Sequence, residues 1–124
     1  IDHFKGYNDM FGHPAGDELL RMLGNLLQQT QRKEDLVGRI GGEEFAIAGM
    51  CEGYEAGRVM AEKARQAVEK SLRPERKTAL RQITVSAGGA LFPCDGVTVE
   101  QLCQAADKRL YQAKQTGRNR VAVV

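Results

Sequence analysis

Glu43 and Glu44 follow a pair of glycines, and no other side chains of this sequence are better suited by type and spacing to do chemistry. Apolar residues with period-two spacing flank these four positions, which predicts a β-hairpin with strands over 36–40 and 45–48 and the glycines at its tip. Two adjacent carboxylates at such a tip repel each other unless a cation lies there. Carboxylate oxygens are ligands that suit Mg²⁺ or Mn²⁺. The turn is therefore either a divalent-metal site or an ordinary solvated turn.

Further short motifs precede and follow this turn over nearly the whole chain. In order, they are Ile1-Asp2-His3-Phe4-Lys5, Asn8-Asp9, Gly12-His13-x-x-Gly16-Asp17, Arg32-x-x-Asp35, Thr84-Val85-Ser86-x-Gly88, Ala106-Asp107-x-x-Leu110-Tyr111 and Ala113-Lys114-x-x-Gly117-Arg118-Asn119. Together with the Gly-Gly-Glu-Glu-Phe turn, this ordered set resembles the GGDEF family of diguanylate cyclases. The resemblance implies an enzyme that condenses two GTP molecules into cyclic di-GMP and releases pyrophosphate, acting as a homodimer of facing domains.

The elements that must position these residues follow from periodicity. Apolar residues at helical spacing and a Thr98 cap predict three helices, and β-branched runs predict two strands besides the hairpin. The helices are expected over 16–30, over 54–72 and from Thr98 onward, the strands over 83–87 and 121–124, and an exposed loop over 71–77. Alternating helices and strands indicate an α/β fold. The resemblance implies the palm-like, ferredoxin-related version, in which helices flank a central, mostly antiparallel sheet.

The front of the chain shows no cap or other sign of a helix start. In the family, a buried strand ends in Asp-x-Asp-x-Phe, and of that aspartate pair only Asp2 is present. The expected domain therefore spans residues 1–124 and lacks its first strand.

Composition excludes several classes of protein. At 124 residues the chain is one domain, and a net charge of +2 gives no reason to expect nucleic-acid binding or direct membrane contact. No apolar run approaches the roughly 20 residues of a membrane span. Cys51, Cys94 and Cys103 are odd in number and lack metal-ligand spacing, so free thiols in a reducing cytoplasm are expected. A cytoplasmic location is predicted, although the parent protein could be anchored in a membrane elsewhere.

The resemblance implies a site for Mg²⁺, or Mn²⁺, on the hairpin. Glu43 would be the essential catalytic ligand, with Glu44 and the backbone carbonyl of Ile1 completing the protein ligands and Lys5 assisting catalysis. The family's other metal-binding aspartate would precede Ile1. The chain as given is therefore expected to be much less active than a longer one.

Asn8 and Asp17 match the guanine-reading residues of the family. A carboxylate can accept hydrogen bonds from guanine N1–H and the exocyclic amine, whereas adenine presents an acceptor at N1. GTP should therefore be preferred over ATP. Without the resemblance, Asp17 is a carboxylate in the first turn of a helix, favoured there by the helix dipole.

The triphosphate would be bound from two segments. The resemblance assigns Lys114 and Arg118 to the terminal phosphates and Lys5 to a supporting role. Backbone N–H groups around Phe4 and Lys5 are natural phosphate donors as well. The alternative for Lys114 and Arg118 is that they complement the dipole at a helix C-terminus, with Gly117 as the cap.

Arg32 and Asp35 have the spacing of the family's product-inhibition site, nine positions before Gly41. An arginine fork can bind a phosphate or a guanine edge, and the aspartate can accept from guanine. Lys63 stands where the family often has a further arginine, so inhibition by cyclic di-GMP should be weaker. The alternative is a surface ion pair that contributes under about 1 kcal/mol.

Two other functions remain open. One is a catalytically silent module that senses cyclic di-GMP or GTP, against which the intact Glu43-Glu44 turn, Lys114 and Arg118 argue. The other is an adenylyl-cyclase-like or polymerase-like domain, against which the guanine-reading pair argues. Nucleotide binding followed by product identification separates all three.

Overall fold

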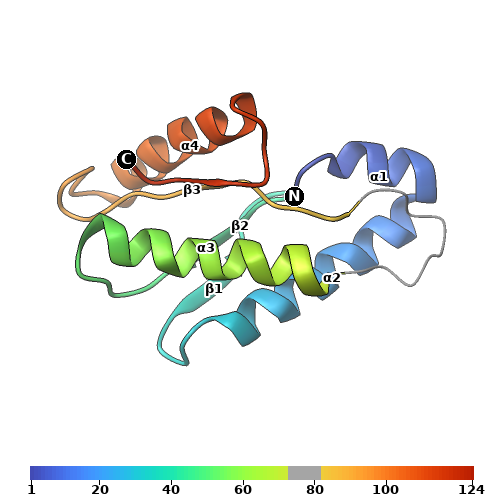
Figure 1. The fold of residues 1–124 in the computed structure, drawn as a ribbon, viewed down its shortest axis with the longest axis horizontal. Helices are drawn as coiled ribbons and strands as arrows, with labels where there is room; N and C mark the ends of the chain where they lie inside the picture. Colours follow the sequence, from blue (N-terminus) through green and yellow to red (C-terminus); the bar gives the residue numbers. More distant parts are fainter. Residues whose placement is uncertain (73–81) are drawn as a thin grey trace.

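A computed structural model describes residues 1–72 and 82–124 of the chain. Its elements are α1 (Phe4–Phe11), α2 (His13–Thr30), β1 (Leu36–Arg39), β2 (Phe45–Ala48), α3 (Gly53–Ser71), β3 (Ala87–Gly88), α4 (Val99–Gln115) and β4 (Val121–Ala122). Figure 1 shows α2 and α3 lying alongside each other, with the strands behind them and α4 at the upper left. Helices α2 and α3 contact each other, α2 also contacts β1, and α4 contacts both β3 and β4. The α/β fold class predicted from the sequence is confirmed.

The apolar stripe of α2 forms the centre of the core. Four of its leucines are buried and pack with residues of α1, α3 and the segment before β3. The buried cluster consists of Phe4, Leu19, Leu20, Leu23, Leu27, Ala64, Val68, Leu72 and Ile83. The amphipathic periodicity thus predicted α2 with the face that it buries, and α3 with Ala64 and Val68 buried. Val59, which the same pattern places inward, is 60% exposed, so that part of the prediction for α3 is wrong. The loop expected over 71–77 lies, from residue 73 onward, outside the described residues.

The strands form two short sheets rather than one. β1 and β2 pair antiparallel from Leu36 opposite Ala48 to Arg39 opposite Phe45, as the hairpin prediction required. β3 and β4 pair in parallel, and each is only two residues long. Most residues of the strands predicted over 83–87 and 121–124 therefore lie outside the hydrogen-bonded ladder. The backbone N–H of Asp2 bonds to the Thr84 carbonyl at 3.0 Å, so the first residues of the chain lie beside the segment before β3.

Helix α1 was not expected, because the sequence lacks a cap at its start. Its N-cap residue, His3, has a left-handed backbone (φ 57°) and makes no side-chain capping bond. Tertiary packing of Phe4, which is buried in one cluster with the leucines of α2, stabilises the helix instead. Within the helix, the rings of Tyr7 and Phe11 also contact each other, with centroids 4.8 Å apart. Packing of an apolar face usually contributes more to helix stability than intrinsic propensity.

Helix α2 begins at His13, three residues before the predicted start. Gly12 has φ 87° and lets the chain turn sharply out of α1, while Pro14 occupies the first turn, where its missing N–H is not needed. Asp17 therefore lies beyond the first turn, and the dipole interpretation of this carboxylate is weakened. The Thr98 cap of α4 is confirmed, since its hydroxyl accepts from the Gln101 N–H at 3.2 Å. Among the described residues, no helix combines the length and the hydropathy needed to cross a membrane.

Candidate active site

A cavity of about 520 Å³ opens between α1, α2 and the tip of the β1–β2 hairpin. It gathers five residues predicted for the site, from three separate segments of the chain. Its lining consists of Phe4, Lys5, Asn8, Asp9, His13, Asp17, Leu20, Arg39, Gly42 and Glu43. The predicted base-reading residues Asn8 and Asp17 therefore share one cavity with Lys5 and Glu43.

Asn8 lies where α1 and α2 approach each other most closely. Its carboxamide packs against the backbone of Gly16, at a distance that leaves no room for a β-carbon there. The carboxamide oxygen is buried and has no hydrogen-bond partner among the described residues. Leaving a buried polar atom unsatisfied costs about 1–3 kcal/mol. Asn8 also lines the cavity, so a ligand bound there lies beside this side chain.

Asp17 reaches the same cavity from α2 and is exposed to solvent. Within the described part of the chain, its carboxylate makes no hydrogen bond or ion pair. Asn8 and Asp17 together present amide and carboxylate groups to a molecule in the cavity. Such a pair suits a base edge that carries adjacent N–H donors.

Arg39 is a residue of the site that sequence reasoning missed. Its guanidinium donates to the carbonyl oxygens of Gly41 and Gly42, at 3.1 and 2.9 Å, and also lines the cavity. The turn is closed by the Ile40 and Gly41 N–H groups, which donate to the Glu44 carbonyl at 2.9 and 3.3 Å. The only available signal was a cation two positions before the glycine pair.

The two glutamates of the turn fit a hard divalent cation. Glu43 lines the cavity, and the Glu44 carboxylate folds back toward Gly41, where an added β-carbon would lie 2.7 Å from one of its oxygens. Neither carboxylate has a hydrogen bond or ion pair with another described residue. No group of three or more side-chain ligands is present within residues 1–72 and 82–124. Mg²⁺ usually takes one or two carboxylates plus phosphate oxygens, so two glutamates with a backbone carbonyl are a suitable donor set.

Ile1 lies beside this turn, as its predicted role requires. Its backbone nitrogen is 3.4 Å from the Glu43 carbonyl oxygen. Lys114, in the last turn of α4, does not line the cavity.

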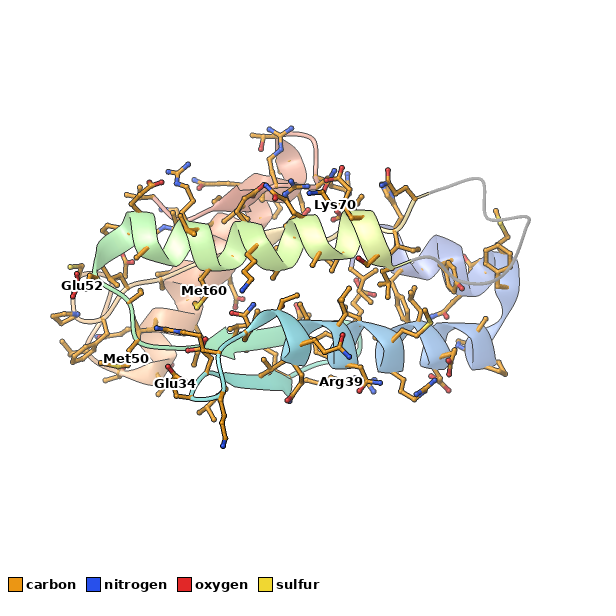
Figure 2. All side chains as sticks on the ribbon, turned by 60° about the horizontal axis from the view of Figure 1, so that its bottom comes forward. Glu34, Arg39, Met50, Glu52, Met60 and Lys70 are labelled. Carbon is orange, nitrogen blue, oxygen red and sulfur yellow. The ribbon has the colours of Figure 1, made fainter. Side chains whose placement is uncertain are left out.

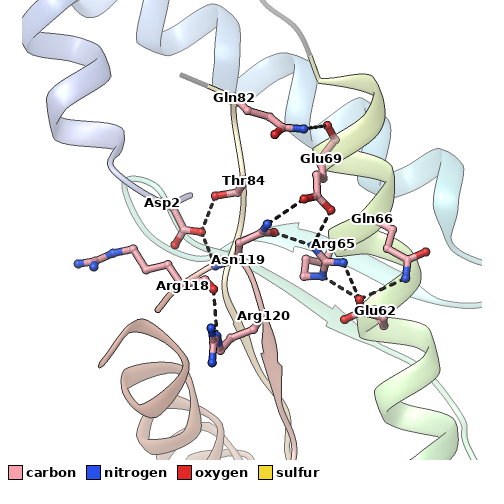
Figure 3. Close-up of polar contacts among 10 residues, drawn as sticks. All are labelled: Asp2, Glu62, Arg65, Gln66, Glu69, Gln82, Thr84, Arg118, Asn119 and Arg120. Atoms are coloured by element: carbon pink, nitrogen blue, oxygen red, sulfur yellow. Dashed lines mark hydrogen bonds and ion pairs between the residues drawn. The ribbon is translucent and has the colours of Figure 1, made fainter. Parts of the chain in front are cut away.

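Arg118 also does not line the cavity. It follows α4 in a left-handed conformation (φ 60°), and its exposed guanidinium has no hydrogen-bond or ion-pair partner among the described residues. The close-up in Figure 3 shows its side chain extending on the side of Asp2. Asp2 is 6% exposed; burial raises its pKa, but hydrogen bonds from Ser86, Thr84 and the Asn119 backbone outweigh burial and lower it.

Arg32 and Asp35 form a second assembled group, away from the cavity. The Arg32 guanidinium contacts the Asp35 carboxylate at 3.2 Å and the Met50 carbonyl at 2.6 Å. The hydrogen bond from Arg32 is the main cause that lowers the pKa of Asp35, and the charge of Lys63 adds to it. Figure 2 shows Met50 at one end of the molecule and Arg39 nearer its middle. The structure therefore brings the three predicted product-site residues together, on a different part of the surface from the cavity.

Comparisons with known proteins agree with this architecture. The family model described as "Diguanylate cyclase, GGDEF domain" matches residues 1–120. The probable diguanylate cyclase DgcT of Escherichia coli is 36% identical over 124 residues, which are 99% of this chain and 27% of DgcT. Diguanylate cyclase A of Treponema denticola is also 36% identical over 124 residues, 99% of this chain and 33% of that protein. The chain thus spans about a third or less of the length of these relatives.

Two solved structures have the same fold. The active GGEEF domain of a diguanylate cyclase from Vibrio cholerae superposes with a TM-score of 0.87 at 34% identity, covering 99% of this chain and 77% of that one. The GGDEF domain of DgcB from Caulobacter crescentus, solved in complex with c-di-GMP, gives a TM-score of 0.87 at 36% identity, covering 99% and 72%. The family match over almost the entire length, on a fold whose cavity gathers the motif residues, establishes that this chain belongs to the GGDEF domain family of diguanylate cyclases.

Proposed function

We propose that this chain is the catalytic domain of a diguanylate cyclase, which condenses two GTP molecules into cyclic di-GMP and releases pyrophosphate. The observation that carries the proposal is the shared cavity, whose lining includes Asn8, Asp17, Lys5 and Glu43. A nucleotide whose base meets the amide and carboxylate would direct its phosphates toward the hairpin turn. GTP is preferred over ATP because adenine has no N–H at N1 that could donate to Asp17.

Each domain would bind one GTP and present it to a second domain. The guanine is held by Asn8 and Asp17, and the phosphates are bound by Lys5, Lys114 and Arg118. Glu43, Glu44 and the Ile1 carbonyl would hold Mg²⁺ or Mn²⁺, which when bound neutralises phosphate charge and favours loss of pyrophosphate. The Arg39 guanidinium keeps the turn in shape by bonding its carbonyl oxygens.

The reaction requires two such domains. The 3′-oxygen of one GTP forms a bond to the α-phosphorus of the other, the bond from that phosphorus to the β-phosphate oxygen breaks, and pyrophosphate leaves. The 3′-oxygen of the second GTP then bonds to the α-phosphorus of the first in the same way, a second pyrophosphate leaves, and the ring is closed. Because the cavity is open and of a size for one nucleotide, a homodimer of domains supplies the second substrate. The three free thiols agree with action in the reducing cytoplasm.

Cyclic di-GMP would also bind at Arg32, Asp35 and Lys63 and inhibit the enzyme. The preassembled contacts of Arg32 with Asp35 and Met50, remote from the cavity, support a separate regulatory site. They equally support the second candidate function, a catalytically silent module that senses cyclic di-GMP. The complex of the DgcB domain with c-di-GMP agrees with either function.

Product identification tests the proposal. The chain and a longer piece of its parent protein are incubated with GTP and Mg²⁺, with ATP and with chelator as controls, over a range of protein concentrations. We expect cyclic di-GMP to form from GTP but not from ATP, and only when the metal is present. The rate of its formation should rise more steeply than the protein concentration. Binding of cyclic di-GMP without turnover in the longer protein would favour the sensor. Products from ATP at comparable rates would refute the base assignment.

A further inference from the structure

The turn after α4 joins three distant parts of the molecule (Figure 3). Gly117, Arg118 and Asn119 have consecutive left-handed backbones, with φ of 124°, 60° and 47°. The Arg118 N–H bonds to the Ala113 carbonyl at 3.0 Å, which ends the helix in a Schellman motif with glycine at its left-handed position. A left-handed backbone is unfavourable for a non-glycine residue, more so for arginine than for asparagine. Two such residues in a row need contacts from outside the turn to stay in this conformation.

Asn119 makes those contacts with α3. Its carboxamide oxygen accepts from Arg65 at 2.6 Å, and its carboxamide nitrogen donates to Glu69 at 2.9 Å. Arg65 is itself held by Glu62 and Glu69, at 2.6 and 2.8 Å, and its side chain is 11% exposed. The carboxamide oxygen therefore meets a cationic donor, and the carboxamide nitrogen meets an anionic acceptor. Neither aspartate, which has no N–H to donate, nor a shorter side chain reproduces this pair of contacts.

Asn119 is joined to the opposite end of the chain through its backbone. Its N–H donates to the Asp2 carboxylate at 3.1 Å, across 117 positions of sequence. The same carboxylate accepts from the hydroxyls of Thr84 and Ser86 at 2.8 and 2.7 Å. Asp2 lies two positions before Phe4, at the start of α1, whose first turn carries Lys5. The two segments proposed to bind the triphosphate thus meet at the Asp2–Asn119 bond.

We propose that Asn119 is the positioning residue for Arg118, holding the turn between Asp2 and α3 so that the backbone of Arg118 stands at a fixed place relative to α1. The inference rests on the proposed function, because it takes GTP phosphate as the ligand of Arg118. The backbone that carries this arginine is already fixed on both sides of the turn, so phosphate binding does not have to order it, which is the general benefit of preorganisation.

A double-mutant cycle tests the inference. GTP and guanosine are titrated by calorimetry into the wild-type chain, Asn119→Gly, Arg118→Ala and the double variant. Glycine keeps the left-handed backbone and removes only the side-chain contacts. Asn119→Gly should weaken GTP binding about tenfold in the wild type and by less than about twofold when Arg118 is already alanine. Guanosine binding, which lacks phosphates, should change by less than about twofold in every variant.

Gln82→Ala is the matched control, because it removes a hydrogen bond to α3, from Gln82 to the Glu69 carbonyl, without touching the turn. It should bind GTP like the wild type. If Asn119→Gly does not fold, Glu69→Ala repeats the cycle by removing the acceptor of the Asn119 amide. If Asn119→Gly lowers GTP affinity equally with and without Arg118, or not at all, the positioning role is overturned and the proposed function is not. A wild-type chain that binds no GTP overturns both this inference and the proposed function.

Discussion

A β-carbon on Gly16 would overlap the carboxamide oxygen of Asn8, so α1 and α2 meet here at a distance that only glycine allows. Gly16→Ala should therefore displace Asn8 from its place in the cavity. Overpacking of this kind costs about 1–3 kcal/mol of stability. Affinity for GTP, measured by calorimetry below the unfolding temperature, should fall as well. Gly6→Ala in α1, where an added β-carbon meets nothing within 4 Å, is the control and should bind GTP normally.

Glu43→Gln keeps the size of the side chain at the cavity wall and removes its charge. Turnover of GTP should fall by several orders of magnitude, while binding of the nucleotide survives in part, because a metal ligand acts mainly on the reacting phosphates. Rates of pyrophosphate release with saturating Mg²⁺ measure the effect. Glu52→Gln, at the exposed start of α3, serves as the control. Wild-type turnover by Glu43→Gln would rule out the metal assignment.

Asp17→Asn should relax the choice between GTP and ATP. The new asparagine carries an N–H donor as well as an acceptor, so it satisfies the guanine N–H groups less well, and it can donate to adenine N1. Sites built to hydrogen-bond a substrate group discriminate by as much as about 10⁴–10⁵, so a loss is readily measured as the ratio of the two affinities. The neighbouring Glu18, which is paired with Arg21, provides the control variant Glu18→Gln. An unchanged preference for GTP would reduce Asp17 to a surface charge.

Arg32→Ala should weaken binding of cyclic di-GMP, because it removes the fork that now bonds to Asp35. Lys63→Arg should strengthen that binding, since arginine can bind phosphate with two parallel hydrogen bonds and lysine cannot. Calorimetric titration of cyclic di-GMP into both variants and the wild type decides the matter. Glu34→Gln, an exposed neighbour of Arg32 at 3.9 Å, is expected to behave like the wild type. Identical affinities in all four proteins would leave Arg32 and Asp35 as a surface pair.

Asp95→Asn should lower stability at neutral pH and matter less in acid. Asp95 accepts two hydrogen bonds from Arg109, at 2.7 and 2.8 Å, and one from the Tyr54 hydroxyl at 2.8 Å, with its side chain 10% exposed. Hydrogen bonds to a charged group contribute about 1.5–3 kcal/mol. The bonds from Arg109 are the main cause that lowers the pKa of Asp95.

A lowered pKa fixes the sign of the pH dependence. The stabilisation by Asp95 is complete above the unfolded pKa of about 3.9 and is lost as the pH falls further toward the folded value. Urea unfolding of wild type and Asp95→Asn between about pH 7 and about pH 3 should therefore show a constant gap that narrows only below about pH 4. Glu55→Gln, from an exposed pair with Arg58, should change stability little at any pH. A gap that does not narrow in acid would contradict the role of the Asp95 charge.

Local patterns in the sequence were sufficient for α2, α3, α4 and the hairpin. The leucines of α2 recur at the helical period, Thr98 offers a side-chain cap, and the glycine pair separates two alternating runs. Each of these signals is carried by residues within a few positions of one another, and local signals need no knowledge of the rest of the fold. The candidate site residues were predicted from the ordered motifs that carry the family resemblance, and their roles stay predictions.

Contacts between distant residues were decided only by the tertiary structure. Helix α1 has no side-chain cap, and its tertiary support comes from Phe4, which is buried in one cluster with the leucines of α2. Arg39 joined the site because the hairpin folds its guanidinium onto the turn carbonyls. Asp2 and Asn119 meet across 117 positions, a pairing that neither segment encodes alone. Hydrogen bonds and buried contacts of this kind depend on where whole elements pack, and packing is a property of the complete chain rather than of any window along it.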